Sequence, residues 1–267
     1  MASYLYDDHL HSAHSCDATA SVPVLCASAR AKGLAGLTVT DHLDTDPRDW
    51  GYCFYDYDAL ARACSEARDA GAGPDLSILL GAEVDYQTPF HQRAADFLRA
   101  CPLDLALGGA HYGQREYIDE AYFSRRAIRA AYDAYLGTVE DTVASGLFDA
   151  LAHLDVAKRY GIPAGASFVV DEHWPRLESI LRGVIQQGMA LEVNASGYRQ
   201  APGEPYPGEA ILRRYYELGG RRLTFGSDAH RPQSVGAGIA EAQALARRLG
   251  FTQGTRYVQR RPVSYPL

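Results

Sequence analysis

The sequence predicts an α/β fold in which short parallel strands alternate with helices and close into a barrel. Seven short apolar segments read as buried strands, helical patterns lie between them, and most of the strands end in a His, Asp or Glu. An open doubly wound sheet is the alternative, but no GxGxxG motif follows the first strand, which weakens its dinucleotide-binding form. The 267 residues contain no linker-like tract, so we expect a single domain over residues 1–267.

The expected strands are rich in Leu, Val, Ile, Phe and Ala, and most do not alternate cleanly between apolar and polar residues. This pattern is typical of parallel strands that are covered on both faces. In chain order they are Tyr4–His9, Ala35–Thr40, Ile78–Val84, Asp104–Ala110, Phe148–His153, Ala190–Asn194 and Leu223–Gly226. Closure into a barrel would bring the carboxyl ends of all seven strands to one rim.

The segments between the strands carry helix start and stop signals. In the first, Ser21 is a candidate N-cap, Pro23 lies in the first turn and Gly33 marks the end. The longest has apolar side chains at steps of three and four residues and is expected to form one helix over residues 119–146. The other helices are expected within residues 21–33, 56–71, 171–188, 207–220 and 236–250.

Composition argues against several classes of partner. The chain has no run of 18 apolar residues, and its first residues lack the basic and apolar regions of a secretory signal, so we expect no membrane partner and a cytoplasmic location. Five cysteines without a CxxC spacing fit a reducing compartment. A net charge of −7 argues against a nucleic-acid partner. The oligomeric state is left open.

Candidate metal ligands follow the expected strands. Every strand except the sixth finishes in a His, Asp or Glu, and these ends share one rim of a barrel. Side chains alternate along a strand, so Asp7, His9 and His11 point the same way, and Asp7 is placed to accept the second ring N–H of a ligand. His91 and His173 lie in helical stretches and are expected to be structural or surface residues. The nine candidate ligands are His9, His11, Asp17, His42, Glu83, His111, His153, Asp228 and His230.

This mixture of donors indicates the kind of metal. Histidines with carboxylates and no cysteine suit zinc, manganese or iron better than calcium or magnesium. Nine ligands exceed the need of one ion, so we expect two or three divalent metal ions, with Glu83 suited to bridge a pair. Such a cluster makes an electropositive pocket on an acidic protein, which would attract a small phosphorylated substrate.

The motifs resemble those of the PHP (polymerase and histidinol phosphatase) family of metal-dependent phosphoesterases. The matching segments are DDHLHSAHSCD, TVTDH, GAEVDY, GGAHY, LAHLD, EVNASGYR and FGSDAH, which run in order from Asp7 to His230. The resemblance looks closest to the single-domain histidinol-phosphate phosphatases. It implies a distorted seven-stranded (β/α)7 barrel, similar to a TIM barrel and known as the PHP fold.

The resemblance also distributes the ligands over three metals. One would be held by His9, His11, Glu83 and Asp228, the second by Glu83, His111 and His153, and the third by Asp17, His42 and His230. His14 is a rival to Asp17 at the third metal. Arg199 matches a family arginine that contacts phosphate, and Lys158 or Arg159 offers a second cation for the substrate.

The implied reaction is hydrolysis of a phosphate monoester, and the leading substrate is L-histidinol phosphate, a step of histidine biosynthesis. In this mechanism a hydroxide that bridges two metals attacks phosphorus, and the metals and Arg199 stabilise the charge on the phosphoryl oxygens. Glu83 and Asp228 act as catalytic metal ligands. The third ion, or His230 beside it, eases the departure of the alcohol.

Three alternatives remain at this point. A family member could act on another small phosphate, such as a nucleotide or a sugar phosphate. A metal-dependent amidohydrolase would need a carbamylated lysine, and no lysine lies at a strand end. A non-catalytic module that serves a polymerase would not need the full ligand set.

Recognition of the leaving group is the least determined part of the site. The ammonium and imidazole of histidinol would need an acidic or aromatic partner, for which Asp44, Asp46 and Tyr55 are the candidates. The aromatic segment WGYCFYDYD, residues Trp50–Asp58, is expected either to line the rim of the pocket or to pack against the barrel.

Overall fold

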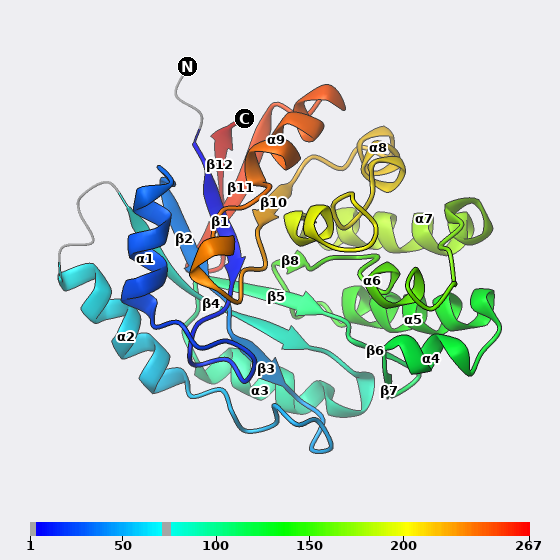
Figure 1. Ribbon diagram of the computed structural model, residues 1–267, viewed down its shortest axis with the longest axis horizontal. Helices are drawn as coiled ribbons and strands as arrows, with labels where there is room; N and C mark the ends of the chain where they lie inside the picture. The colour runs from blue at the N-terminus through cyan, green and yellow to red at the C-terminus, as the bar shows by residue number, and fades with distance from the viewer. Residues whose placement is uncertain (1–3, 71–75) are drawn as a thin grey trace.

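The computed structural model describes residues 4–70 and 76–267, and its centre is a parallel sheet that curls into a barrel (Figure 1). The strand order is β1-β2-β4-β5-β8-β9-β10. Their bounds are β1 (Tyr6–Leu10), β2 (Gly36–Val39), β4 (Ser77–Asp85), β5 (Leu105–Gly109), β8 (Ala150–Leu151), β9 (Ala190–Asn194) and β10 (Leu223–Gly226). Each of the seven expected strands corresponds to one of these.

The first and last strands of this sheet meet just beyond the end of β10. The backbone N–H of Asp228 donates to the carbonyl of His9 at 2.7 Å, and the N–H of His11 donates to the carbonyl of Ala229 at 2.9 Å. A parallel bridge joins Leu10 to Ala229. The barrel is therefore nearly closed, which confirms the expected α/β class and the seven-stranded barrel.

Helices surround the barrel (Figure 1). They are α1 (Val22–Ala31), α2 (Tyr57–Asp69), α3 (His91–Ala100), α4 (Glu120–Ser124), α5 (Ile128–Ala144), α6 (Lys158–Gly161), α7 (Val170–Gln186), α8 (Glu209–Glu217) and α9 (Ile239–Arg248). Three short 3-10 helices connect them, η1 (Thr88–Phe90), η2 (Ala195–Arg199) and η3 (Pro232–Ser234). Within the described residues, no helix is long and apolar enough to span a membrane.

The prediction of a single helix over residues 119–146 was wrong, because this segment forms two helices, α4 and α5. Ala127 adopts an extended conformation, with φ −62° and ψ 134°, at the start of α5. Just before it, Arg125 and Arg126 both pair with Glu116. We attribute the break to this shared acid, which holds both arginines against the preceding hairpin of β6 (Tyr112–Gly113) and β7 (Glu116–Tyr117).

The two histidines that were expected to be structural or surface residues both have side-chain partners outside the candidate ligands. The Nδ1 atom of His91, at the start of α3, lies 3.0 Å from the hydroxyl of Tyr86. His173 is buried in α7, where its Nδ1 atom lies 2.9 Å from a carboxylate oxygen of Asp133.

A C-terminal hairpin, which the sequence pattern did not indicate, covers the end of the barrel where the strands begin. It consists of β11 (Gln253–Val258) and β12 (Arg261–Pro266). Tyr257 joins Leu105, Leu107 and neighbouring alanines in a small apolar cluster, and its hydroxyl donates to the carbonyl of Asp149 at 2.8 Å. The hairpin thus closes one end and leaves the other, where the carboxyl ends of the strands lie, for the candidate ligands.

Candidate active site

Glu83, near the end of β4, lies at the centre of the group of candidate ligands. Its side chain is 1% exposed, and its two carboxylate oxygens face different histidines. Oε2 lies 3.1 Å from Nε2 of His9 and 3.2 Å from Nδ1 of His42. Oε1 lies 2.6 Å from Nε2 of His153 and 3.4 Å from Nε2 of His111. One buried carboxylate is therefore shared by two sets of imidazoles.

Barrel closure brings a second carboxylate to the same place. Because Asp228 follows β10 and is hydrogen-bonded to the backbone of β1, its Oδ1 atom lies 3.5 Å from Nε2 of His11 and 3.9 Å from Nε2 of His9. Asn194 and Ser196 donate to its other oxygen at 3.4 and 3.3 Å, which fixes the orientation of the carboxylate.

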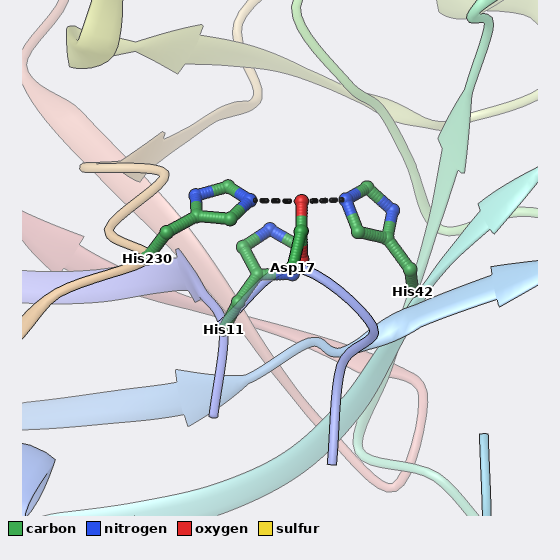
Figure 2. A group of neighbouring side chains, drawn as sticks. All are labelled: His11, Asp17, His42 and His230. Carbon is green, nitrogen blue, oxygen red and sulfur yellow. Dashed lines mark ion pairs between the residues drawn. The ribbon is translucent and has the colours of Figure 1, made fainter. Parts of the chain in front are cut away.

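Asp17 lies with three histidines, His11, His42 and His230, at the outer side of the group (Figure 2). Its Oδ2 atom lies 2.8 Å from Nε2 of His230 and 3.4 Å from Nε2 of His42, and the ring of His11 lies between the other two. His14, the rival for this position, belongs to none of the candidate metal groups in the described part of the chain. The structure thus favours Asp17.

The structure brings all nine candidate ligands together. They form four overlapping groups of three or four residues whose ligand atoms lie within 4.8 Å of one another. The groups are His11, Asp17, His42 and His230; His9, Glu83 and His153; His9, His11 and Asp228; and His42, Glu83 and His111.

A buried glutamate that the sequence analysis missed orients His9. Glu192, in β9, lies with Oε1 2.6 Å from Nδ1 of His9 and accepts a hydrogen bond from the backbone N–H of His153 at 2.8 Å. The prediction that Asp7 has this role was wrong, because the Asp7 carboxylate instead accepts from the N–H and hydroxyl of Ser227. Glu192 lies inside the sixth strand, two residues before its end, so a search of strand ends did not find it.

A similar carboxylate orients His111. Oδ1 of Asp85 lies 3.2 Å from Nδ1 of this histidine and accepts its backbone N–H at 3.1 Å. In both cases the outer ring nitrogen is occupied, so the Nε2 atom is left facing the cluster. Such outer partners fix the tautomer and the angle of a metal-ligating ring.

Electrostatics show how strongly the acids and imidazoles interact. Burial would raise the pKa of Glu83, but the adjacent imidazoles of His9 and His42 outweigh it and hold that pKa well below the usual value. Burial, together with the charges of His230 and His42, lowers the pKa of His11 to about 3. His11 is therefore neutral near pH 7 and has a nitrogen lone pair available for a cation.

The residues present fit divalent metal ions. The buried Nδ1 atoms of His42 and His153 have no hydrogen-bond partner within the described residues. Nδ1 of His42 nevertheless faces Oε2 of Glu83 at 3.2 Å, and two such acceptor atoms attract one another only through a proton or a metal ion. Imidazole and carboxylate donors without cysteine match the ligand preferences of zinc and related ions.

The cluster forms the floor of a cavity of about 370 Å3. Among its lining residues are two arginines, Arg159 and Arg231, of which Arg231 was not predicted. The remaining lining residues are Cys16, Asp17, His42, Asp44, Asp49, Trp50, Glu83, His111, Tyr117, His153, Val156, Tyr160, Asp228 and His230. The cavity therefore places cationic side chains beside a candidate metal cluster.

Two predicted cations lie elsewhere. Lys158 is buried, and its ammonium pairs with Asp155 at 2.7 Å and with Glu204 at 2.8 Å. Arg199, in η2, donates to the carbonyls of Ser227 at 2.6 Å and Ala237 at 3.1 Å. Neither side chain is part of the cavity lining, so their roles in substrate binding stay predictions that this geometry does not support.

Of the candidates for leaving-group recognition, only Asp44 lines the cavity. The Asp46 carboxylate accepts from Nε of Arg48 at 3.0 Å, and the Tyr55 hydroxyl donates to the carbonyl of Gly81 at 3.0 Å. Trp50 lines the cavity as well, whereas Tyr55 packs edge-on against Phe97. The aromatic segment therefore contributes one residue to the rim and another to packing.

Comparisons with known proteins show what this chain is similar to. A probable histidinol-phosphatase of Deinococcus radiodurans is 30% identical over 260 residues, which cover 92% of this chain and 94% of that protein. A histidinol-phosphatase of Lactococcus lactis is 26% identical over 251 residues, which cover 92% of this chain and 91% of that protein. The fold is similar to the crystal structure of histidinol phosphate phosphatase from Lactococcus lactis, which was complexed with zinc, L-histidinol and phosphate. The match covers 97% of this chain and 98% of the Lactococcus lactis chain, with a TM-score of 0.89 and 21% sequence identity.

A family model gives the same result. The model of the PHP domain matches residues 7–196, which include Glu192 and seven of the nine candidate ligands, all except Asp228 and His230. This match covers well over half of the chain. The chain belongs to the PHP domain family.

Proposed function

We propose that the chain, acting as one phosphoesterase domain, is a metal-dependent phosphatase that hydrolyses L-histidinol phosphate to L-histidinol and phosphate. The observation that carries the proposal is the position of Glu83, whose two oxygens face separate sets of histidines at the floor of a cavity that is also lined by arginines. The names of the relatives in Deinococcus radiodurans and Lactococcus lactis support the choice of substrate.

Two or three divalent ions, of zinc, manganese or iron, would be held by the nine ligands. By the family resemblance, His9, His11, Glu83 and Asp228 would form one site, Glu83, His111 and His153 the second, and Asp17, His42 and His230 the third. The structure groups some of these ligands differently, with His9, Glu83 and His153 in one group and His42, Glu83 and His111 in another. When bound, such ions supply positive charge that polarises a phosphoryl group and lowers the pKa of water. Zinc has direct support from the Lactococcus lactis phosphatase, which was crystallised with it.

The chain's own residues have three tasks in this reaction. Arg159 and Arg231 border the cavity and bind the phosphoryl oxygens, for which the planar guanidinium is well suited. Glu192 and Asp85 hold His9 and His111 at fixed angles. Asp228 and His230 line the same cavity, which places both in reach of the reacting group.

The geometry disfavours amidohydrolase chemistry. That chemistry would need a lysine at the cluster, and the sequence contains only two lysines, Lys32 and Lys158. Neither is a lining residue of the cavity. Lys32 donates to the carbonyl of Val235, and Lys158 is paired with two carboxylates.

Metal analysis combined with phosphate release tests the proposal. The purified protein should contain at least two equivalents of a divalent transition metal and release phosphate from L-histidinol phosphate with a kcat/KM well above that for nucleotide and sugar phosphates. Removal of the metal should abolish the activity, and zinc or manganese should restore it. Equal activity on all the esters would instead indicate a family member with another substrate.

A further inference from the structure

One arginine of the C-terminal hairpin reaches into the barrel from the end that the hairpin covers. Arg256, in β11, is only 6% exposed, and its guanidinium carbon lies 4.1 Å from the centre of the Tyr6 ring in β1. Gly36, opposite Tyr6 in β2, leaves room for it, because an added Cβ there would come within 3.1 Å of Nη1. The Nη2 atom lies 4.0 Å from Oδ1 of Asp8. Arg256 therefore places a buried positive charge beside β1.

The partner of this charge, Asp8, is the residue next to the first metal ligand. A bulge in β1 sets Asp8 and His9 opposite one residue of β2, Thr38, so the usual alternation of side chains is interrupted there. His9 points at Glu83, while the buried Asp8 carboxylate accepts a hydrogen bond from the Thr38 hydroxyl at 2.7 Å. The bulge therefore connects the acid that faces Arg256 directly to a candidate ligand.

A second buried acid, Glu192, lies on the other side of His9. Its Oε1 atom lies 2.6 Å from Nδ1 of this histidine, the contact that orients the ring. Burial raises the pKa of Asp8, the charge of Arg256 lowers it, and the charge of Glu192 raises it. The two carboxylates thus repel one another inside the barrel, and Arg256 opposes the effect.

Several polar atoms of this layer have no hydrogen-bond partner among the residues that the structure describes. They are Oδ2 of Asp8, Nε and Nη2 of Arg256, and Oγ1 of Thr224, which lies opposite Glu192 in the pairing of β10 with β9. Buried polar atoms of this kind are normally bridged by ordered water. A buried charge pair with incomplete hydrogen bonding contributes little to stability, which indicates another role for this layer.

We propose that Arg256 is a positioning residue for the metal site, which offsets the charge of Asp8 so that Glu192 keeps its contact with His9. The inference rests on the proposed metal-dependent function and extends it to the hairpin at the opposite end of the barrel. Without Arg256, the carboxylate of Asp8 would repel that of Glu192 across a medium of low dielectric constant, and His9 would lose its fixed angle. The hairpin thus influences metal affinity without contacting the metal.

Arg256→Met tests the proposal, because it removes the charge and keeps an unbranched side chain against Tyr6. The affinity for zinc, measured by competition with a chelator, should fall about 10- to 100-fold, as expected when the outer partner of a metal ligand is lost. With zinc in excess, KM for L-histidinol phosphate should be unchanged, since Arg256 is not among the described residues that line the cavity. Arg256→Lys retains the charge and should recover most of the affinity.

A double variant distinguishes the effect of charge from a loss of packing. Asp8→Asn combined with Arg256→Met removes both charges, so Asp8 no longer repels Glu192, and zinc affinity should be well above that of Arg256→Met alone. Arg260→Met is the matched control from the same hairpin, because Arg260 pairs with Asp149 at 2.9 Å. It should lower the melting temperature and leave zinc affinity unchanged.

The outcomes separate this proposal from the proposed function. A wild-type protein that binds zinc, with an Arg256→Met variant of equal zinc affinity, would overturn the positioning role and leave the phosphatase function intact. An equal fall in affinity for Arg256→Met and Arg260→Met would also overturn it, since docking of the hairpin alone would then matter.

The double variant decides the remaining cases. If Arg256→Met does not fold but the double variant does and binds zinc, the charge of Asp8 is the cause, as proposed. A double variant that does not fold, or that binds zinc no better than Arg256→Met, would overturn the proposal. A wild-type protein that binds no divalent metal would contradict the proposed function itself.

Discussion

At the scale of single residues, Glu83 has the largest expected effect. Its two oxygens face separate sets of imidazoles, so Glu83→Gln should weaken the binding of two metal ions at once. Loss of a residue that only orients a metal ligand can lower activity by ~100-fold, and loss of Glu83 itself should lower kcat by more than that. Inductively coupled plasma analysis would measure the metal content. His111→Asn, which alters one ligand at the edge of the cluster, is the comparison and should leave more metal bound than Glu83→Gln does.

Glu192 should affect metal affinity without contacting the metal. Its two oxygens face His9 Nδ1 and the N–H of His153, and a glutamine has only one oxygen for these two contacts. Glu192→Gln should therefore weaken metal binding by about 10- to 100-fold, measured by competition with a chelator. Glu178→Gln, on the surface of α7, is the control. Equal metal affinity in the two variants would argue against the orienting role.

Substitution of Arg159 should affect substrate binding, whereas substitution of Arg199 should affect stability. Because Arg159 lines the cavity and Arg199 binds the carbonyls of Ser227 and Ala237, we expect Arg159→Ala to raise KM at least tenfold at constant metal content. Arg199→Ala should instead lower the melting temperature, by about 2–4 °C for each kcal/mol lost. A large rise of KM for Arg199→Ala at unchanged stability would restore the role that the motif EVNASGYR predicts.

At the scale of elements, the sequence predicted the strands and several helices but missed the C-terminal hairpin. Its turn explains why. Gln259 and Arg260 both have positive φ, 49° and 61°, in a turn that normally favours Asn and Gly. The chain accepts this conformation because Arg260 binds the carboxylate of Asp149 and the N–H of Gln259 donates to Asp104 at 3.0 Å. Such tertiary contacts cannot be predicted from the residues of the turn alone.

The same turn gives a stability prediction. Gln259→Gly should relieve the cost of a left-handed conformation, about 1 kcal/mol, and keep the backbone hydrogen bond to Asp104. The melting temperature should rise by about 2–4 °C. Gln253→Gly, in β11, is the control and should lower it, because glycine weakens a strand. A lower melting temperature for Gln259→Gly would mean that the turn is not strained.

At the scale of the whole molecule, the candidate site could be predicted further than its surroundings. Eight of the nine ligands lie at or near strand ends, where a parallel barrel brings them together whatever the details of packing, whereas Asp17 lies in the loop between β1 and α1. Glu192 could not be found in this way, because its place inside β9 matters only through the neighbouring strand β1. The partners of Lys158 and Arg199 likewise depend on loops whose path no local pattern determines.

Metal removal should destabilise the whole barrel, because ions that bind only the folded state stabilise it. Metal present at about 1,000 times its dissociation constant would contribute about 4 kcal/mol, so a chelator should lower the melting temperature by roughly 10 °C. Differential scanning calorimetry with and without the chelator measures this shift. Readdition of zinc should restore the melting temperature. A melting temperature that is the same with and without the chelator would contradict stabilisation of the fold by metal.

The junction between β1 and the end of β10 has a consequence for biosynthesis. During translation His9 and His11 leave the ribosome more than 200 residues before Asp228 and His230. The nascent chain therefore carries only part of the ligand set until the last barrel strand has docked. The site that includes Asp228 can therefore be loaded with metal only after the last barrel strand has docked, when the cell's supply of each ion determines which one that site receives.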